Sequence, residues 1–275
     1  MSRRIVIAHS PDSDDAFMFY AFAAGKVDTK GYEFDHYLND IQTLNSKAEK
    51  GCYEISAISI HAYPYVSDKY ELMTCGASMG DNYGPMVITK KNISPEELST
   101  KTVAVPGLKT SAYLALKLWN PNIRTIVMPF DKIMEAVEQG NAEAGLIIHE
   151  GQLTWKERGL HSVVNLGEWW YDYTGGLPLP LGGNVVRRDL GGKTIRDLND
   201  ILREAIRYSI EHKEEALRYA MTYAGELSRE KAGTFVSMYV NDLTIDYGER
   251  GREAVRRFLD MAVERGIIKT VAGSR

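Results

Sequence analysis

The stretch Ala144-Gly-Leu-Ile-Ile-His-Glu-Gly151 is a short apolar run that stops at a histidine, a carboxylate and a glycine. Such a run is typical of a buried strand in a parallel sheet. Ligands of open α/β sheets bind outside the carboxyl ends of the strands, where His149 and Glu150 would emerge. Imidazole transfers protons near neutral pH because its ordinary pKa is about 6.5. From these residues alone, His149 fits a proton-transfer group and a structural histidine equally well, and Glu150 fits an orienting group or a turn cap.

The organisation around this stretch occurs twice in the chain. The order strand, turn, helix, strand, helix, strand is predicted in residues 4–61 and again in residues 102–151. Two such units predict an α/β protein with two lobes and a cleft between them, in which mixed sheets are flanked by helices. We expect residues 1–90 plus 185–275 to form a discontinuous first lobe that includes the C-terminal helices. Residues 91–184 are expected to form the second lobe.

The composition excludes several classes of protein. The chain has 275 residues, with 44% hydrophobic and 25% charged residues, as in a globular protein. A net charge of −4 argues against a nucleic-acid partner, and no apolar run is long enough to span a membrane. The apolar stretch near the N-terminus is too short for a signal peptide, so we expect a cytoplasmic protein. Cys52 and Cys75 lack metal-ligand spacing and are expected to be reduced, buried side chains.

Hydroxyl and carboxylate side chains collect where predicted strands lead into helices. Ser10 follows the first strand, and the carboxylates at positions 12, 14 and 15 can cap or open the next helix. Thr110 and Ser111 open a helix over 112–119, whose first N–H groups form an anion-binding corner. Spacing alone favours capping for both hydroxyls and leaves ligand binding open. Further helix starts are predicted at Ser94-Pro-Glu-Glu97, a capping box, and at Asp40, Asp131 and Thr194.

The segment Gly175-Gly-Leu-Pro-Leu-Pro-Leu-Gly-Gly-Asn184 combines glycine, proline and leucine. Its leucines disfavour a plain surface loop, so we expect a buried crossover between the lobes. Its glycines allow a ligand to approach the backbone closely or the chain to bend at a hinge.

Four motifs together resemble the 1,4-dihydroxy-6-naphthoate synthase family of the futalosine route to menaquinone. They are Ser10-Pro-Asp-Ser-Asp-Asp-Ala-Phe17, Ser59-Ile-His-Ala-Tyr-Pro-Tyr65, Gly145-Leu-Ile-Ile-His-Glu-Gly151 and Pro178-Leu-Pro-Leu-Gly-Gly-Asn184. The resemblance covers nearly the whole chain. Where the family often has Cys-Pro-Asn-Asp after its first Ser-Pro, this chain has Asp-Ser-Asp-Asp at residues 12–15.

The resemblance implies the two-lobed fold of type II periplasmic binding proteins and a lyase that acts on cyclic dehypoxanthine futalosine. It implies no metal and no organic cofactor. His149 corresponds to the proposed general base of the family. The implied substrate-binding residues are Ser10, Ser59, Thr110, Ser111, Gly183 and Asn184.

Two other functions share this fold. Chorismate dehydratase of the same pathway is disfavoured by the Leu-Ile-Ile-His-Glu motif, which is typical of the synthase. A non-enzymatic solute-binding protein or sensor would need no histidine at a strand end, and fold alone does not decide between these functions. The expected partner is a small-molecule substrate, and a homodimer is the candidate assembly.

Overall fold

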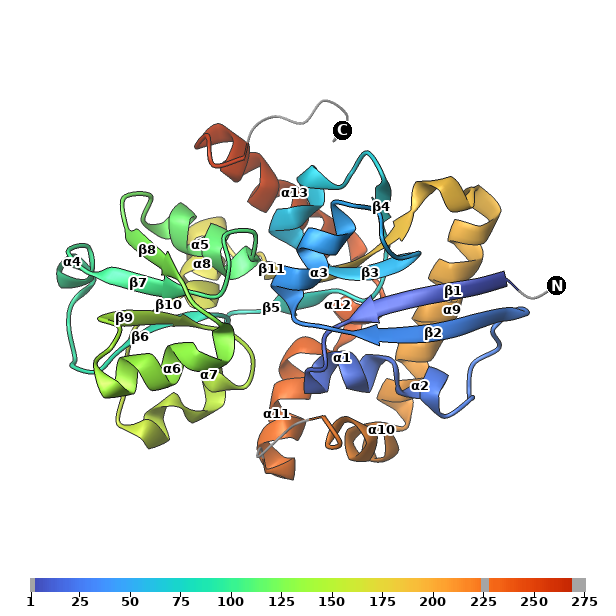
Figure 1. Ribbon diagram of the computed structural model, residues 1–275, viewed down its shortest axis with the longest axis horizontal. Helices are drawn as coiled ribbons and strands as arrows, with labels where there is room; N and C mark the ends of the chain where they lie inside the picture. The colour runs from blue at the N-terminus through green and yellow to red at the C-terminus, as the bar shows by residue number, and fades with distance from the viewer. Residues whose placement is uncertain (1–2, 224–227, 269–275) are drawn as a thin grey trace. The chain divides into compact units, whose positions relative to one another are not determined.

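The computed structural model of the chain describes residues 3–223 and 228–268 (Figure 1). These residues form two compact units. Unit 1 contains residues 3–78 and the described residues of 182–249, and unit 2 contains residues 79–181 and 250–268. The chain changes unit within the strand β5 (Ser78–Gly80), within β11 (Leu179–Arg187), and near the start of the helix α13 (Gly248–Glu264).

Unit 1 is built on a mixed sheet with the strand order β2-β1-β3-β11-β4, and β5 also pairs with β11. The strands β1 (Arg3–His9), β2 (Tyr32–Leu38) and β3 (Ile55–Ser59) are parallel to one another. β11 runs antiparallel to β3 and to β4 (Tyr70–Leu72). The carboxyl ends of β1, β2 and β3 therefore share one edge of the sheet.

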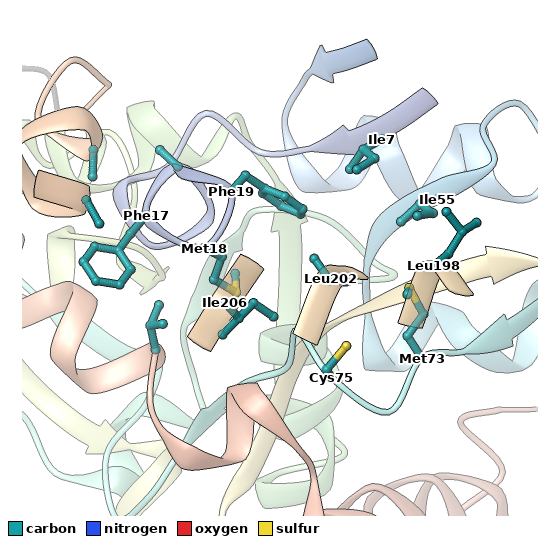
Figure 2. Close-up of a cluster of buried hydrophobic side chains, with 14 of the residues drawn as sticks. Ile7, Phe17, Met18, Phe19, Ile55, Met73, Cys75, Leu198, Leu202 and Ile206 are labelled. Atoms are coloured by element: carbon teal, nitrogen blue, oxygen red, sulfur yellow. The ribbon is translucent and has the colours of Figure 1, made fainter. Parts of the chain in front are cut away.

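Alternation along these strands sends apolar side chains to both faces of the sheet. Ile5, Ile7 and Ile55 join a large core with residues of α1, α9, α10 and α11 (Figure 2). Ala8 points the other way and packs against Leu44 of α3. The helical segments of unit 1 are α1 (Ser13–Met18), α2 (Tyr20–Ala23), α3 (Ile41–Ala48), η1 (Ile60–Tyr65), η3 (Arg188–Leu190), α9 (Gly192–Glu211), α10 (Lys213–Ala220), α11 (Arg229–Tyr239) and α12 (Asp242–Ile245).

Unit 2 contains a second mixed sheet with the strand order β10-β6-β9-β7-β8. The strands β7 (Thr102–Val105), β8 (Arg124–Val127) and β9 (Ala144–Ile147) are parallel, and β6 (Met86–Thr89) runs antiparallel to β9 and to β10 (His161–Asn165). The other helical segments of this unit are α4 (Pro95–Leu98), α5 (Ser111–Trp119), α6 (Phe130–Gln139), α7 (Gly151–Thr154), η2 (Trp155–Arg158) and α8 (Leu166–Thr174). The carboxyl ends of β7, β8 and β9 again share one edge.

The observed units differ from the expected lobes at their borders. Residues 79–90 belong to unit 2 because β6 pairs with β9 and β10. Most of α13 also belongs to unit 2, where Phe258 packs edge-on against Trp170 with ring centroids 5.3 Å apart. Arg250 strengthens this attachment by binding both carboxylate oxygens of Asp81. The expected placement of all C-terminal helices in the first lobe was therefore wrong for the last helix.

Two predicted helix caps were also wrong. The N-cap of α6 is Pro129, and Asp131 lies in the first turn. α9 begins at Gly192, so Thr194 lies inside it. The caps predicted at Asp40 and Ser94 were correct, because Asp40 accepts from the Thr43 N–H and Ser94 forms a complete capping box with Glu97.

Candidate active site

Ser59 is the last residue of β3 and lies buried at the carboxyl edge of the unit 1 sheet. Asn45 of α3 holds it from two sides. The Ser59 N–H donates to Asn45 Oδ1 at 2.8 Å, and Asn45 Nδ2 donates to Ser59 Oγ at 3.1 Å. In its bond with Asn45 Nδ2 the Ser59 Oγ is the acceptor, so this contact does not use the hydroxyl hydrogen of Ser59. Sequence reasoning did not select Asn45, which looks like an ordinary polar residue of an amphipathic helix.

Ser10 lies directly after β1 at the same edge and is held by two carboxylates. Its Oγ donates to Asp12 Oδ2 at 2.7 Å, and its N–H donates to Asp15 Oδ2 at 2.8 Å. The Asp12 N–H donates back to Ser10 Oγ at 3.1 Å. Asp12 occupies the N-cap position of α1, but its side chain makes no capping hydrogen bond. The carboxylates therefore shape the turn around Ser10.

A pair of histidines supports this turn and was not recognised in the sequence. His9 Nδ1 lies 2.8 Å from the Ser10 carbonyl oxygen, and His9 Nε2 lies 3.1 Å from His36 Nδ1. A carbonyl oxygen only accepts, so His9 carries its proton on Nδ1 and accepts at Nε2 from His36. The His9 ring is buried and stacks on Phe19 with centroids 4.3 Å apart. Burial lowers the pKa of His9 to about 4, although the hydrogen bond that His9 donates to the Ser10 carbonyl oxygen acts in the opposite direction.

Gly183 and Asn184 lie in β11, inside unit 1. A β-carbon at residue 183 would stand 2.6 Å from Tyr247 Oη, so a larger residue there would have to displace the buried Tyr247 side chain. Asn184 is buried, and its Nδ2 donates to the Gly76 carbonyl oxygen at 3.0 Å. Among the described residues Asn184 Oδ1 and Tyr247 Oη have no hydrogen-bond partner. Both candidates therefore have structural roles in addition to the predicted role in substrate binding.

In unit 2, Thr110 and Ser111 begin α5 at the carboxyl edge of the sheet. Thr110 Oγ1 accepts from the Tyr113 N–H at 3.2 Å and donates to the Gly107 carbonyl oxygen at 2.9 Å, so Thr110 is the N-cap. Ser111 Oγ donates to the Leu181 carbonyl oxygen. Both side chains are buried, and the first N–H groups of α5 face outward from its N-terminal end.

His149 follows β9, which ends at Ile147, two residues before the predicted position. Its backbone is in the left-handed region at φ 57°, which non-glycine residues rarely adopt. The half-buried imidazole rests against Phe130, the first residue of α6, with ring centroids 4.7 Å apart and planes inclined at 60°. The His149 carbonyl oxygen accepts from the Gln152 N–H, which begins the turn into α7. Backbone strain of this kind collects at functional sites.

No three histidine, cysteine, aspartate or glutamate residues within 3–223 and 228–268 are grouped so that they could hold a metal ion. None of the helices in these ranges is both long enough and apolar enough to cross a membrane.

The fold class of the protein follows from its two units and from solved structures that share them. The periplasmic aliphatic sulphonate-binding protein of Escherichia coli aligns over 98% of this chain and 90% of its own, with a TM-score of 0.67 and 11% identity. At that identity the likeness shows the fold alone, which is the type II periplasmic-binding-protein fold. A crystal structure of a protein from Archaeoglobus fulgidus is much more similar, with a TM-score of 0.92 and 46% identity over 96% of this chain and 98% of its own.

Sequence comparison narrows this class to one family. Residues 5–264 match the family described as menaquinone biosynthesis. The 1,4-dihydroxy-6-naphthoate synthase of Thermus thermophilus is 40% identical over 95% of this chain and 94% of its own length. The synthase of Streptomyces coelicolor is 37% identical over the same shares. The chain belongs to the 1,4-dihydroxy-6-naphthoate synthase family of menaquinone biosynthesis and is an enzyme, a lyase.

Proposed function

We propose that this enzyme converts cyclic dehypoxanthine futalosine to 1,4-dihydroxy-6-naphthoate, with His149 as the general base. The observation that carries the proposal is the placement of His149. It follows a buried parallel strand, in a strained backbone conformation, with its imidazole against an aromatic ring. The substrate itself is inferred from the family resemblance. We further propose that the enzyme acts in the cytoplasm and needs neither a metal nor an organic cofactor.

In the proposed reaction the His149 imidazole removes a proton from a substrate carbon next to a carbonyl group. The electron pair moves onto the carbonyl oxygen and forms an enolate. Cleavage of the ring-junction bond then releases the remaining sugar-derived carbons as a separate small molecule, to which the protonated His149 returns its proton. Aromatisation of the remaining bicyclic ring to the naphthalene diol favours this step.

The carboxyl edge of each sheet carries polar groups that are suited to bind substrate oxygens, and those of unit 2 are suited to stabilise the enolate. Ser59 is fixed by Asn45 in an orientation that allows it to donate a hydrogen bond. The N-terminal end of α5, where Thr110 and Ser111 lie, favours negative charge because its N–H groups and the helix dipole point the same way. Preorganised donors of this kind stabilise charge that develops in a transition state.

The test is turnover of cyclic dehypoxanthine futalosine, followed as naphthoate formation by chromatography. His149→Ala should lower kcat by about 10²- to 10⁴-fold while substrate binding largely survives. His161→Ala is the matched control, since His161 is an exposed histidine at the start of β10 in the same unit. Full activity of His149→Ala would remove the base from the mechanism. A folded wild-type protein that forms no naphthoate, or that turns over chorismate instead, would overturn the proposed reaction.

A further inference from the structure

We propose that Phe130 is a positioning and specificity residue of this site, which holds the His149 imidazole and offers an apolar wall to the six-membered ring of the substrate. This inference rests on the proposed function and deepens it. It assigns a role to a side chain that neither a sequence motif nor the capping pattern of α6 explains.

The exposure of Phe130 is the first reason. Its side chain is 37% exposed, although it is the first residue of a helix whose Ile133, Ala136 and Val137 are buried. Among the described residues, Phe130 is the only phenylalanine in the group of exposed large hydrophobic side chains. An exposed phenyl ring in direct contact with an imidazole is suited to meet an apolar ligand surface.

The position of Phe130 in the sheet is the second reason. The neighbouring parallel strands β9, β7 and β8 end at the same edge. His149 follows β9, Leu108 follows β7 and Phe130 follows β8. Leu108 is also exposed, at 51%. Two exposed apolar side chains and one imidazole therefore follow three adjacent strand ends, an arrangement that fits a carbocyclic substrate with one proton to be removed.

The contact with His149 is the third reason. His149 lies two residues beyond the end of β9, and its backbone is in the left-handed region. The Phe130 ring, 4.7 Å away between centroids, restricts the orientation of the imidazole. Orientation of a base relative to its proton contributes strongly to rate, so loss of this contact should lower kcat. Loss of ring stacking with the substrate should raise KM.

The test compares Phe130→Leu with the wild type. Leucine keeps an apolar side chain at the start of α6 but removes the aromatic face. We expect kcat to fall about 10-fold or more from misorientation of the base, and KM to rise about 2- to 10-fold, as for a lost aromatic pair. Val127→Ala is the matched control, because Val127 is a similarly exposed apolar residue at the end of β8. It should leave both constants unchanged.

Two further readouts separate this role from a merely structural one. Binding of 2-naphthoate and of cyclohexanecarboxylate is measured by calorimetry, and Phe130→Leu should lose affinity for the aromatic probe only. The His149 ring signals, assigned by NMR with His149→Ala, should shift in Phe130→Leu and stay in place in Val127→Ala. A Phe130→Leu variant with reduced thermal stability but wild-type kcat, KM and probe selectivity would overturn the inference. If the proposed function itself is wrong, the wild-type enzyme forms no naphthoate, a result distinct from those above.

Discussion

The buried His9 predicts a specific loss of stability in mild acid. The native structure holds His9 neutral, because burial disfavours the imidazolium and the ring must accept a hydrogen bond at Nε2 from His36. Its pKa is lowered from 6.5 to about 4, with His36 acting in the same direction and Asp12 opposing it. In the unfolded chain the same ring takes up a proton near its ordinary pKa.

The sign and size of the effect follow from proton linkage. The pKa of His9 is lower in the folded state than in the unfolded state, so the unfolded state binds more protons between pH 6.5 and about 4. The free energy of unfolding therefore decreases as the pH falls through this range. At about 1.4 kcal/mol for each pH unit, the full loss is about 3.5 kcal/mol. About 2 kcal/mol of this should be lost between about pH 7 and pH 5, and none of it above neutral pH.

The assay is urea unfolding at several pH values, followed by far-UV circular dichroism. All four tryptophans lie at positions 119, 155, 169 and 170 in unit 2, so their fluorescence would not report directly on unit 1, which contains His9. His9→Asn should be less stable than the wild type at pH 7 but lose about 2 kcal/mol less between pH 7 and 5. His161→Asn removes an exposed histidine of unit 2 and serves as the control. Parallel pH dependences of wild type and His9→Asn would refute the reasoning.

Two further predictions concern thiol reactivity and close packing. The expectation that both cysteines are buried was wrong for Cys52, which is exposed. Native protein should therefore react with a thiol reagent at Cys52 only, because burial raises the pKa of Cys75 to about 12; rapid modification of two thiols before unfolding would contradict this. Gly167→Ala should lower the free energy of unfolding by about 1–3 kcal/mol, since the added β-carbon would stand 1.9 Å from the Tyr83 carbonyl oxygen. Unchanged stability of this variant in urea unfolding would show that the backbone there yields easily.

Features that depend on a few neighbouring residues were predictable from the sequence. The capping box of Ser94 and Glu97 was correct, and a strand does begin the second predicted unit at residue 102, because both signals lie within four residues. Asp131 and Thr194 were mistaken for caps, since capping residues are also common inside the first turn of a helix.

Local sequence patterns could not predict the borders of the two units. β6 reads as a strand by itself, but only its pairing with β9 and β10 assigns it to unit 2. In the same way, α13 has an ordinary amphipathic sequence, and its contacts with Trp170 and Asp81 decide where it packs. Pairing of this kind joins residues far apart in the chain, and no single window of sequence contains both partners.

The candidate site likewise has some features that the sequence predicts and others that only the tertiary structure shows. Polar signals at the strand end before His149 and at the helix start of Thr110 and Ser111 are recognisable in the sequence, and both left a structural role open. The family resemblance favoured His149 as the base and added Ser59 as a substrate-binding residue. The left-handed backbone of His149 and its contact with Phe130 emerged only in the tertiary structure. So did the hydrogen bond between His9 and His36, which lie 27 residues apart on adjacent parallel strands. Sequence determines which groups reach the edge of a sheet, whereas packing between distant segments decides their protonation and orientation.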